Sequence, residues 1–185
     1  MKNKFLGLLI LSSIFFVSAC KNEDPSPINE EELITNVDLV FTDENGNESI
    51  ASFSDNDGVG GEEPTLSGAS LSANTTYQLS IQLRNESVSP AIDITAEIEE
   101  EATDHQFFFL PDASLQLSVT YNDEDAEGHP IGLKNTAQTL NNSTGMLTIV
   151  LRHKPNKSAA NVAEGSIDNA AGETDVEVSF PITIQ

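Results

Sequence analysis

Apolar and polar residues alternate strictly near the end of this 185-residue chain, at residues 176–184. The apolar side chains that share one face are Val176, Val178, Phe180, Ile182 and Ile184. A period of two is typical of a β-strand with one face buried. Pro181 falls on the opposite face, and because proline cannot donate a backbone hydrogen bond it indicates an edge strand.

The same alternation recurs along the chain. Strands are expected at residues 37–41, 50–53, 76–83, 106–110, 115–121, 146–153 and 176–184. Asn45-Gly46 separates the first two and is typical of a hairpin turn, because glycine readily adopts a positive φ. About seven short strands with turn residues between them predict an antiparallel immunoglobulin-like β-sandwich. We therefore expect one β-sandwich domain over residues 33–185.

Residues 91–104 depart from the strand pattern. Their apolar residues recur at helical spacing, namely Ala91, Ile94, Ile98 and Ala102, and acids fill the other faces. This predicts one short acidic helix that Asp93 or Ser89 would cap. Acids near its C-terminal end oppose the helix dipole, so a bound cation or a basic partner would relieve their repulsion. A solvated surface helix explains the same pattern.

The first twenty residues have the pattern of an export signal. Lys2 and Lys4 precede a largely apolar run at residues 5–17, which is too short to span a bilayer about 30 Å thick. The run ends in Val17-Ser18-Ala19-Cys20, which resembles a bacterial lipobox. The resemblance implies removal of residues 1–19 as a signal peptide and acylation of Cys20, which would anchor the chain in a membrane. Residues 20–32, rich in proline, serine and acids, are expected to form a tether.

Charge and cysteine content exclude several classes of protein. With 8 basic and 30 acidic residues the net charge is −22, so we expect no nucleic-acid partner. Cys20 is the single cysteine, which excludes a disulfide framework and a cysteine-based zinc site. The chain has no nucleophile elbow, phosphate-binding loop, dinucleotide-binding glycine motif or zincin motif. We therefore predict that the protein is not an enzyme.

The three histidines are the first candidate ligand set. His105 follows Glu101 by four residues, so one helical turn would bring the two side chains together. His153 ends an expected strand, and His129 lies in an expected loop. Imidazole and carboxylate suit Zn²⁺ or Cu²⁺, so we predict a metal site of His105, His153 and Glu101, with His129 as an optional lid. Three unrelated histidines, exposed or hydrogen-bonded, are the alternative.

Two acidic loops, at residues 55–63 and 122–128, resemble calcium-binding loops. Their candidate ligands are Asp55 and Asp57 in the first and Asp123, Asp125 and Glu127 in the second. The second opens like an EF-hand loop, but the position of the closing glutamate is occupied by Lys134. Calcium is therefore a less favoured expectation than zinc or copper, and a solvated turn explains each loop as well.

Further runs resemble a family of small Bacteroidota lipoproteins. These runs are residues 104–109, 121–125, 130–133, 151–157 and 172–185, together with the lipobox and the tether. Members tend to be encoded near TonB-dependent outer-membrane receptors, and some are described as type 1 periplasmic-binding-fold proteins. That description implies two α/β lobes, for which this chain has neither the length nor the helices. The lysine and acids of residues 21–24 also resemble a signal for export to the cell surface.

The resemblance implies a lipid-anchored outer-membrane protein, on the cell surface or the periplasmic face. It also implies a non-catalytic protein that captures a ligand, such as a metal ion or metal complex, in cooperation with a TonB-dependent receptor. The alternative is a structural or adhesive surface module with calcium-stiffened loops. Capture predicts histidines that converge on one ion, whereas adhesion predicts scattered histidines and an exposed apolar patch.

Overall fold

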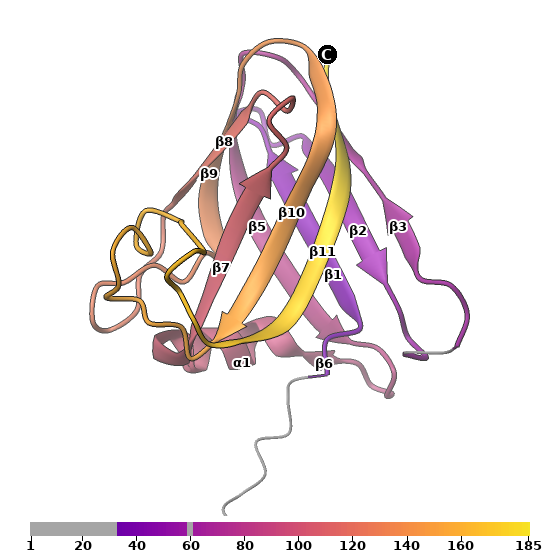
Figure 1. Ribbon diagram of the computed structural model, residues 1–185. Helices are drawn as coiled ribbons and strands as arrows, with labels where there is room; N and C mark the ends of the chain where they lie inside the picture. Colours follow the sequence, from indigo (N-terminus) through magenta and orange to yellow (C-terminus); the bar gives the residue numbers. More distant parts are fainter. Residues whose placement is uncertain (1–32, 59–60) are drawn as a thin grey trace, which may run out of the picture.

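The computed structural model describes residues 33–58 and 61–185 (Figure 1). Its elements, in chain order, are β1 (Asn36–Thr42), β2 (Glu48–Ser54), β3 (Thr65–Ser67), β4 (Ala69–Leu71), β5 (Thr76–Asn85), β6 (Ile92–Asp93), α1 (Ile94–Glu100), a 3₁₀ turn η1 (Ala102–Asp104), β7 (His105–Pro111), β8 (Leu117–Tyr121), β9 (Lys134–Thr139), β10 (Ser143–His153) and β11 (Glu173–Ile184). The predicted signal peptide, Cys20 and the tether lie outside the described residues.

The strands form two sheets that face each other (Figure 1). The larger sheet has the order β3-β2-β1-β5-β9-β8, with β6 paired to β5, and the smaller has the order β4-β11-β10-β7. The pairs are antiparallel except for β4 with β11, which run parallel. The predicted fold class, a mostly β antiparallel sandwich with one short acidic helix, is confirmed.

Inward-facing side chains of both sheets form the main core. Its largest fully buried members include Phe41, Leu79, Phe107, Ile149 and Phe180. The alternation that predicted β11 places its apolar face in this core. Pro181 is exposed. Because β4 pairs with β11 only at Ile182–Ile184, Pro181 lies just outside the part of β11 that has a neighbouring strand on both sides.

The β1–β2 hairpin forms where Asn45-Gly46 predicted it. Gly46 has a φ of 81°, a left-handed conformation that residues with a side chain rarely adopt. Asp43 accepts hydrogen bonds from the backbone N–H groups of Asn45 and Asn47 and from the Asn47 side chain. The side-chain bond from Asn47 is the main reason that the pKa of Asp43 is lowered.

A second apolar cluster lies on the outer face of the smaller sheet. It contains Phe108, Val150, Val162 and Ala170, of which the last two belong to the connection at residues 154–172. This connection lies beside the first part of β7 (Figure 1), and its apolar side chains pack against Phe108 of β7 and Val150 of β10. Because both faces of β7 are covered, Phe107 and its neighbour Phe108 are both fully buried.

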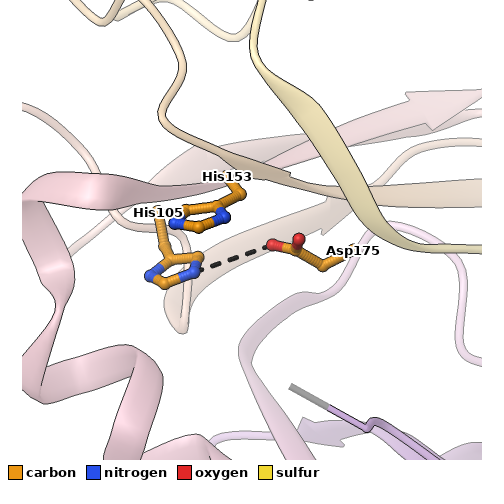
Figure 2. Close-up of side chains that lie close together, drawn as sticks. All are labelled: His105, His153 and Asp175. Atoms are coloured by element: carbon orange, nitrogen blue, oxygen red, sulfur yellow. Dashed lines mark ion pairs between the residues drawn. The ribbon is translucent and has the colours of Figure 1, made fainter. Parts of the chain in front are cut away.

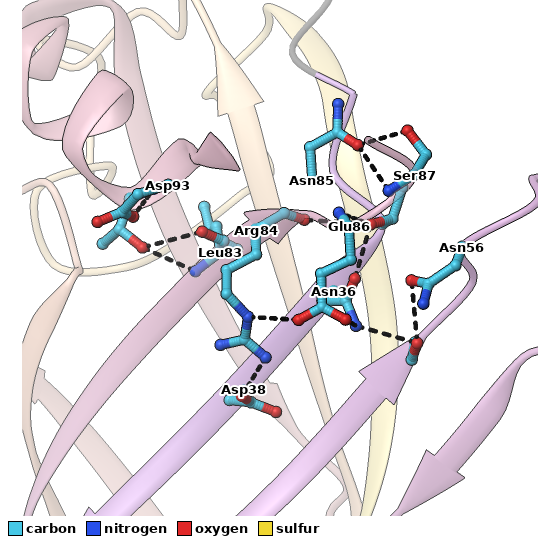
Figure 3. A network of polar contacts seen from close by, with 12 residues as sticks. Asn36, Asp38, Asn56, Leu83, Arg84, Asn85, Glu86, Ser87 and Asp93 are labelled. Atoms are coloured by element: carbon cyan, nitrogen blue, oxygen red, sulfur yellow. Dashed lines mark hydrogen bonds and ion pairs between the residues drawn. The ribbon is translucent and has the colours of Figure 1, made fainter. Parts of the chain in front are cut away.

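The helix is shorter than residues 91–104, where we expected it. Ile92 and Asp93 pair with β5 as β6, and α1 begins only at Ile94. Of the two predicted caps, Asp93 and Ser89, Asp93 is the N-cap (Figure 3), and its carboxylate accepts from the N–H of Thr95. Buried Ile94 and Ile98 hold α1 against the end of the sandwich where β7 begins and β10 ends (Figure 1). Within the described residues, no helix is both long enough and apolar enough to cross a membrane.

Candidate metal centre

Three side chains meet at the end of the sandwich next to α1 (Figure 2). His105 is the first residue of β7, His153 is the last of β10, and Asp175 lies near the start of β11. One nitrogen or oxygen atom from each lies within 4.8 Å of those from the other two. Over residues 33–58 and 61–185, this is the one such group of three or more histidine, cysteine, aspartate or glutamate side chains.

The pairing of β7 with β10 brings the two histidines together. His105 and His153 are direct cross-strand partners at the last position of this antiparallel pair. Both lie on the inner face of the smaller sheet, because Phe107 and Leu151, two residues away on each strand, are in the main core. The imidazole rings stack with their centroids 4.9 Å apart and their planes at 10°.

A β-bulge brings the carboxylate of Asp175 to the same face. Leu151 pairs with Val176 and Arg152 pairs with Thr174, so Asp175 is an extra residue on β11 without a counterpart on β10. Strict alternation would place Asp175 on the opposite face from Val176. The extra residue of a bulge changes the direction of a side chain in this way. Its Oδ2 atom lies 3.6 Å from Nε2 of His105.

Glu101 contributes its backbone to this group. Nδ1 of His105 lies 3.2 Å from the carbonyl oxygen of Glu101. Because a carbonyl oxygen only accepts, Nδ1 carries the proton, and in the neutral ring the lone pair is then on Nε2. Such a second bond fixes the orientation and tautomer of a metal-binding histidine. A proton on Nε2 makes His105 an imidazolium ion paired with Asp175, and a metal cation would occupy the same position between them.

The side chains of His105, His153 and Asp175 are shielded from solvent. The side chains of His105 and Asp175 are 0% and 2% exposed, and His153 is 5% exposed. Two imidazoles and one carboxylate are a ligand set suited to Zn²⁺ or Cu²⁺. Ligands at about 2.0–2.2 Å from one ion lie roughly 3.3–3.6 Å from one another. Nε2 of His105 and Oδ2 of Asp175, 3.6 Å apart, already have this spacing, and a pair of ligand atoms at the 4.8 Å limit would move closer by about 1.2–1.5 Å on binding an ion.

The other two predicted ligands lie elsewhere. The side chain of Glu101 is exposed, and the helical turn that we expected to join it to His105 is absent, since α1 ends at Glu100 and His105 begins a strand. His129 lies in the loop before β9, with Nδ1 at 3.9 Å from Glu127 Oε2 and 4.0 Å from Asp125 Oδ1. Two of the three histidines thus converge, with Asp175 in the place that we expected Glu101 to take.

The second acidic loop already surrounds a cation, the ammonium group of Lys157. Its Nζ donates to Asp125 Oδ2 at 2.9 Å and to the carbonyl oxygens of Ala102 and Pro130 at 2.6 and 3.0 Å. The side chains of Lys157 and Asp125 are 5% and 1% exposed. Asp123 instead accepts from the backbone N–H groups of Gly132 and Lys134, both at 2.8 Å. These carboxylates organise the loop through bonds within the chain.

The hydrogen bonds to Asp125 decide its ionisation. Burial alone would raise its pKa, but the bond from Lys157 and the backbone N–H groups of His129 and Glu127 outweigh it, so the pKa is lowered. In the first acidic loop, Asp55 accepts from the N–H of Gly58 and Asp57 from that of Glu62. Within the described residues, neither loop supplies a group of three side chains placed to hold an ion.

Two important residues escaped prediction from the sequence. Asp175 directly precedes the alternating run, and only an expected bulge would place it inside. Lys157 follows Lys154 in a polar segment. Its buried position depends on contacts with Asp125 and Ala102, which lie 32 and 55 residues earlier in the chain. The one feature of the sequence that could have pointed to Lys157 is the basic character of residues 152–157 in so acidic a chain.

The protein is thus a mostly β sandwich with a buried group of two histidines and one aspartate at one end. No protein-family model matches the chain, and no curated protein matches it. Among solved structures, it is similar to domains 4 and 5 of the S-layer protein SbsC, with 9% sequence identity and a TM-score of 0.32. That match covers 74% of this chain and 63% of the other.

Proposed function

We propose that the protein is a non-catalytic, lipid-anchored outer-membrane protein that binds one Zn²⁺ or Cu²⁺ ion through His105, His153 and Asp175. On this proposal it captures the ion, or a complex of it, in cooperation with a TonB-dependent receptor. The observation that supports the metal site is the convergence of two imidazoles and one carboxylate at one buried point. Nitrogen ligands favour zinc or copper over calcium, which prefers oxygen.

Metal binding is tested by thermal unfolding of the purified full chain with Zn²⁺, Cu²⁺ or Ca²⁺. Free ion at 100 times its Kd adds about 2.7 kcal/mol to the free energy of unfolding, which raises the Tm measurably. We expect this rise with zinc or copper in the wild type and in His129→Ala, and its loss in the double variant His105→Ala/His153→Ala. A rise that survives in the double variant, or is lost in His129→Ala, would contradict the proposed site.

The lipid anchor and the receptor partnership are supported by the lipobox at residues 17–20 and by the family resemblance. We expect the protein to fractionate with outer membranes, and Cys20→Ala to release it. Mass spectrometry of the N-terminal peptide should give the mass of an acylated cysteine. Tagged protein should co-purify with a TonB-dependent receptor from detergent-solubilised outer membranes. Recovery of unmodified Cys20 in the mature protein would contradict the anchor.

The burial of the group favours a second candidate function, a structural surface module in which the ion stabilises the fold. Capture requires that the ion be released to a partner, whereas a structural ion stays bound while the protein is folded. Transfer of bound zinc to an excess of chelator distinguishes the two. Release within minutes under native conditions supports capture, and release only on unfolding supports the structural module.

A further inference from the structure

The ligand group is closed to solvent, so an ion reaches it only when a covering segment moves. The three side chains are between 0% and 5% exposed. One neighbouring segment, residues 101–104, leads directly into His105 and contains η1. The carbonyl oxygen of Glu101 contacts Nδ1 of His105 itself. Movement of this segment would therefore break the contact that orients the His105 ring.

The packing of this segment against the main core is limited to Ala102, which is half-buried. None of the three residues of η1 is buried. The helix before it has only seven residues, with no basic residue in its last turn to offset the helix dipole. Glu97 and Glu101 lie one helical turn apart, and their like charges repel. A short segment with little burial belongs to the part of a fold that opens most easily.

Contacts from the chain after β10 hold η1 in place. Nζ of Lys157 donates to the carbonyl oxygen of Ala102, and the backbone N–H of Lys154 donates to that of Asp104, both at 2.6 Å. The same ammonium is bound to Asp125 and to the Pro130 carbonyl, so all three of its protons are used. Lys157 thereby joins η1 to the loop at 122–130 and to the connection at 154–172.

We propose that residues 101–104 are the gate of the metal site and that Lys157 is the clasp that sets how often the gate opens. This inference rests on the proposed function, since it concerns the passage of the ion to His105, His153 and Asp175. The charges outside the gate suit a cation. Glu100 and Glu101 are exposed and Asp104 is half-buried, so their negative field would raise the local concentration of a divalent metal.

The test measures the rates of zinc binding and release by stopped flow, with a chromophoric chelator as the reporter. The variant is Lys157→Met/Asp125→Asn, which removes both charges of the buried pair and avoids leaving one unpaired. The control is Lys154→Met, which removes a nearby exposed lysine but keeps its backbone bond to Asp104. We expect both rates to rise at least tenfold in the double variant, with less than a threefold change in Kd, and the control to match the wild type.

The possible outcomes separate the two proposals. If wild-type protein binds zinc but the double variant has unchanged rates, the clasp is overturned and the metal site stands. If wild-type protein binds no zinc, the proposed function itself fails. Hydrogen exchange on the wild type gives a second test that needs no variant. The amides of residues 102–105 should exchange faster than those of 149–151 and slow down with zinc, and exchange as slow as in the core would contradict a gate.

Discussion

The imidazole ring of His105 lies parallel to that of His153, with centroids 4.9 Å apart and planes at 10°. The antiparallel register of β7 and β10 makes them direct partners, and the burial of both strands holds them there. An imidazole binds a metal through a lone pair in the plane of its ring. Two stacked rings must therefore turn toward a common point before both can bind one ion.

This stacking predicts a coupled response of the two rings. On addition of Zn²⁺, the side-chain nitrogen signals of His105 and His153 should shift together in ¹H–¹⁵N NMR spectra and reach saturation at the same zinc concentration. His129 is a matched internal control, because it lies with Glu127 and Asp125 rather than in the group. A shift of His129 in parallel with the other two would contradict the arrangement.

The carboxylate of Asp175, rather than that of Glu101, is predicted to bind the ion. Asp175→Asn keeps the shape of the side chain but removes the anionic ligand, so zinc affinity should fall by at least about tenfold. Glu101→Gln should leave the affinity within about twofold, because Glu101 acts through its backbone carbonyl oxygen. Isothermal titration of both variants measures the difference. Equal losses in the two would show that Glu101 is also a ligand.

Metal affinity is predicted to fall on acidification. Histidine binds a metal only through a nitrogen that carries no proton, so protons compete with the ion for its ligands. Between pH 7.5 and pH 5 we expect zinc binding to weaken by at least about tenfold. The measurement is a competition titration at each pH with a chelator whose own pH dependence is known. Affinity that does not change over this range would mean that histidines take no part.

The pair of Lys157 and Asp125 is predicted to stabilise the fold with a defined pH dependence. Replacing Lys157 alone by Met leaves a carboxylate that is 1% exposed without its cation and should cost about 3–5 kcal/mol at pH 7. Lys157→Met/Asp125→Asn should cost much less. Because the folded-state pKa of Asp125 is lowered, its contribution is complete above the unfolded value of about 3.9 and is lost as the pH falls through the folded value.

Urea unfolding at pH 7 and pH 3 measures this contribution. The wild type should lose more stability between the two pH values than the double variant, in which the titrating carboxyl group is absent. Other carboxylates titrate in both proteins, so the comparison isolates Asp125. Equal losses would show that the pair contributes no pH-dependent stability.

The strands that alternate most regularly could be predicted from the sequence, because one face of each is in the core. β1, β5 and β11 were found in this way. β9 was missed because its inward positions include the buried polar residues Asn135 and Thr139. Each donates a side-chain hydrogen bond to a backbone oxygen, Asn135 Nδ2 to the Gly132 carbonyl at 2.7 Å and Thr139 Oγ1 to the Ser72 carbonyl at 2.7 Å. Hydrogen bonds of this kind depend on the fold, so the sequence of β9 has no periodic pattern of apolar residues.

The candidate site was predictable in part. His105 and His153 were expected together as ligands, and the register of β7 with β10 makes them neighbours. Asp175 could not be predicted, because alternation assigns it to the outer face and only the bulge on β11 turns it inward. The side chain of Glu101 was expected beside His105, but it is exposed and only the backbone carbonyl oxygen of Glu101 contacts the ring, since α1 ends at Glu100.

The X-ray absorption spectrum of zinc bound to the purified protein at one equivalent tests the proposed metal centre itself. We predict nitrogen and oxygen ligands at about 2.0–2.1 Å, with the multiple-scattering signal of two imidazoles. The spectrum should lose that signal in His105→Ala/His153→Ala and keep it in His129→Ala. A bound zinc without imidazole ligands, or no bound zinc at one equivalent, would contradict a metal centre formed by His105, His153 and Asp175.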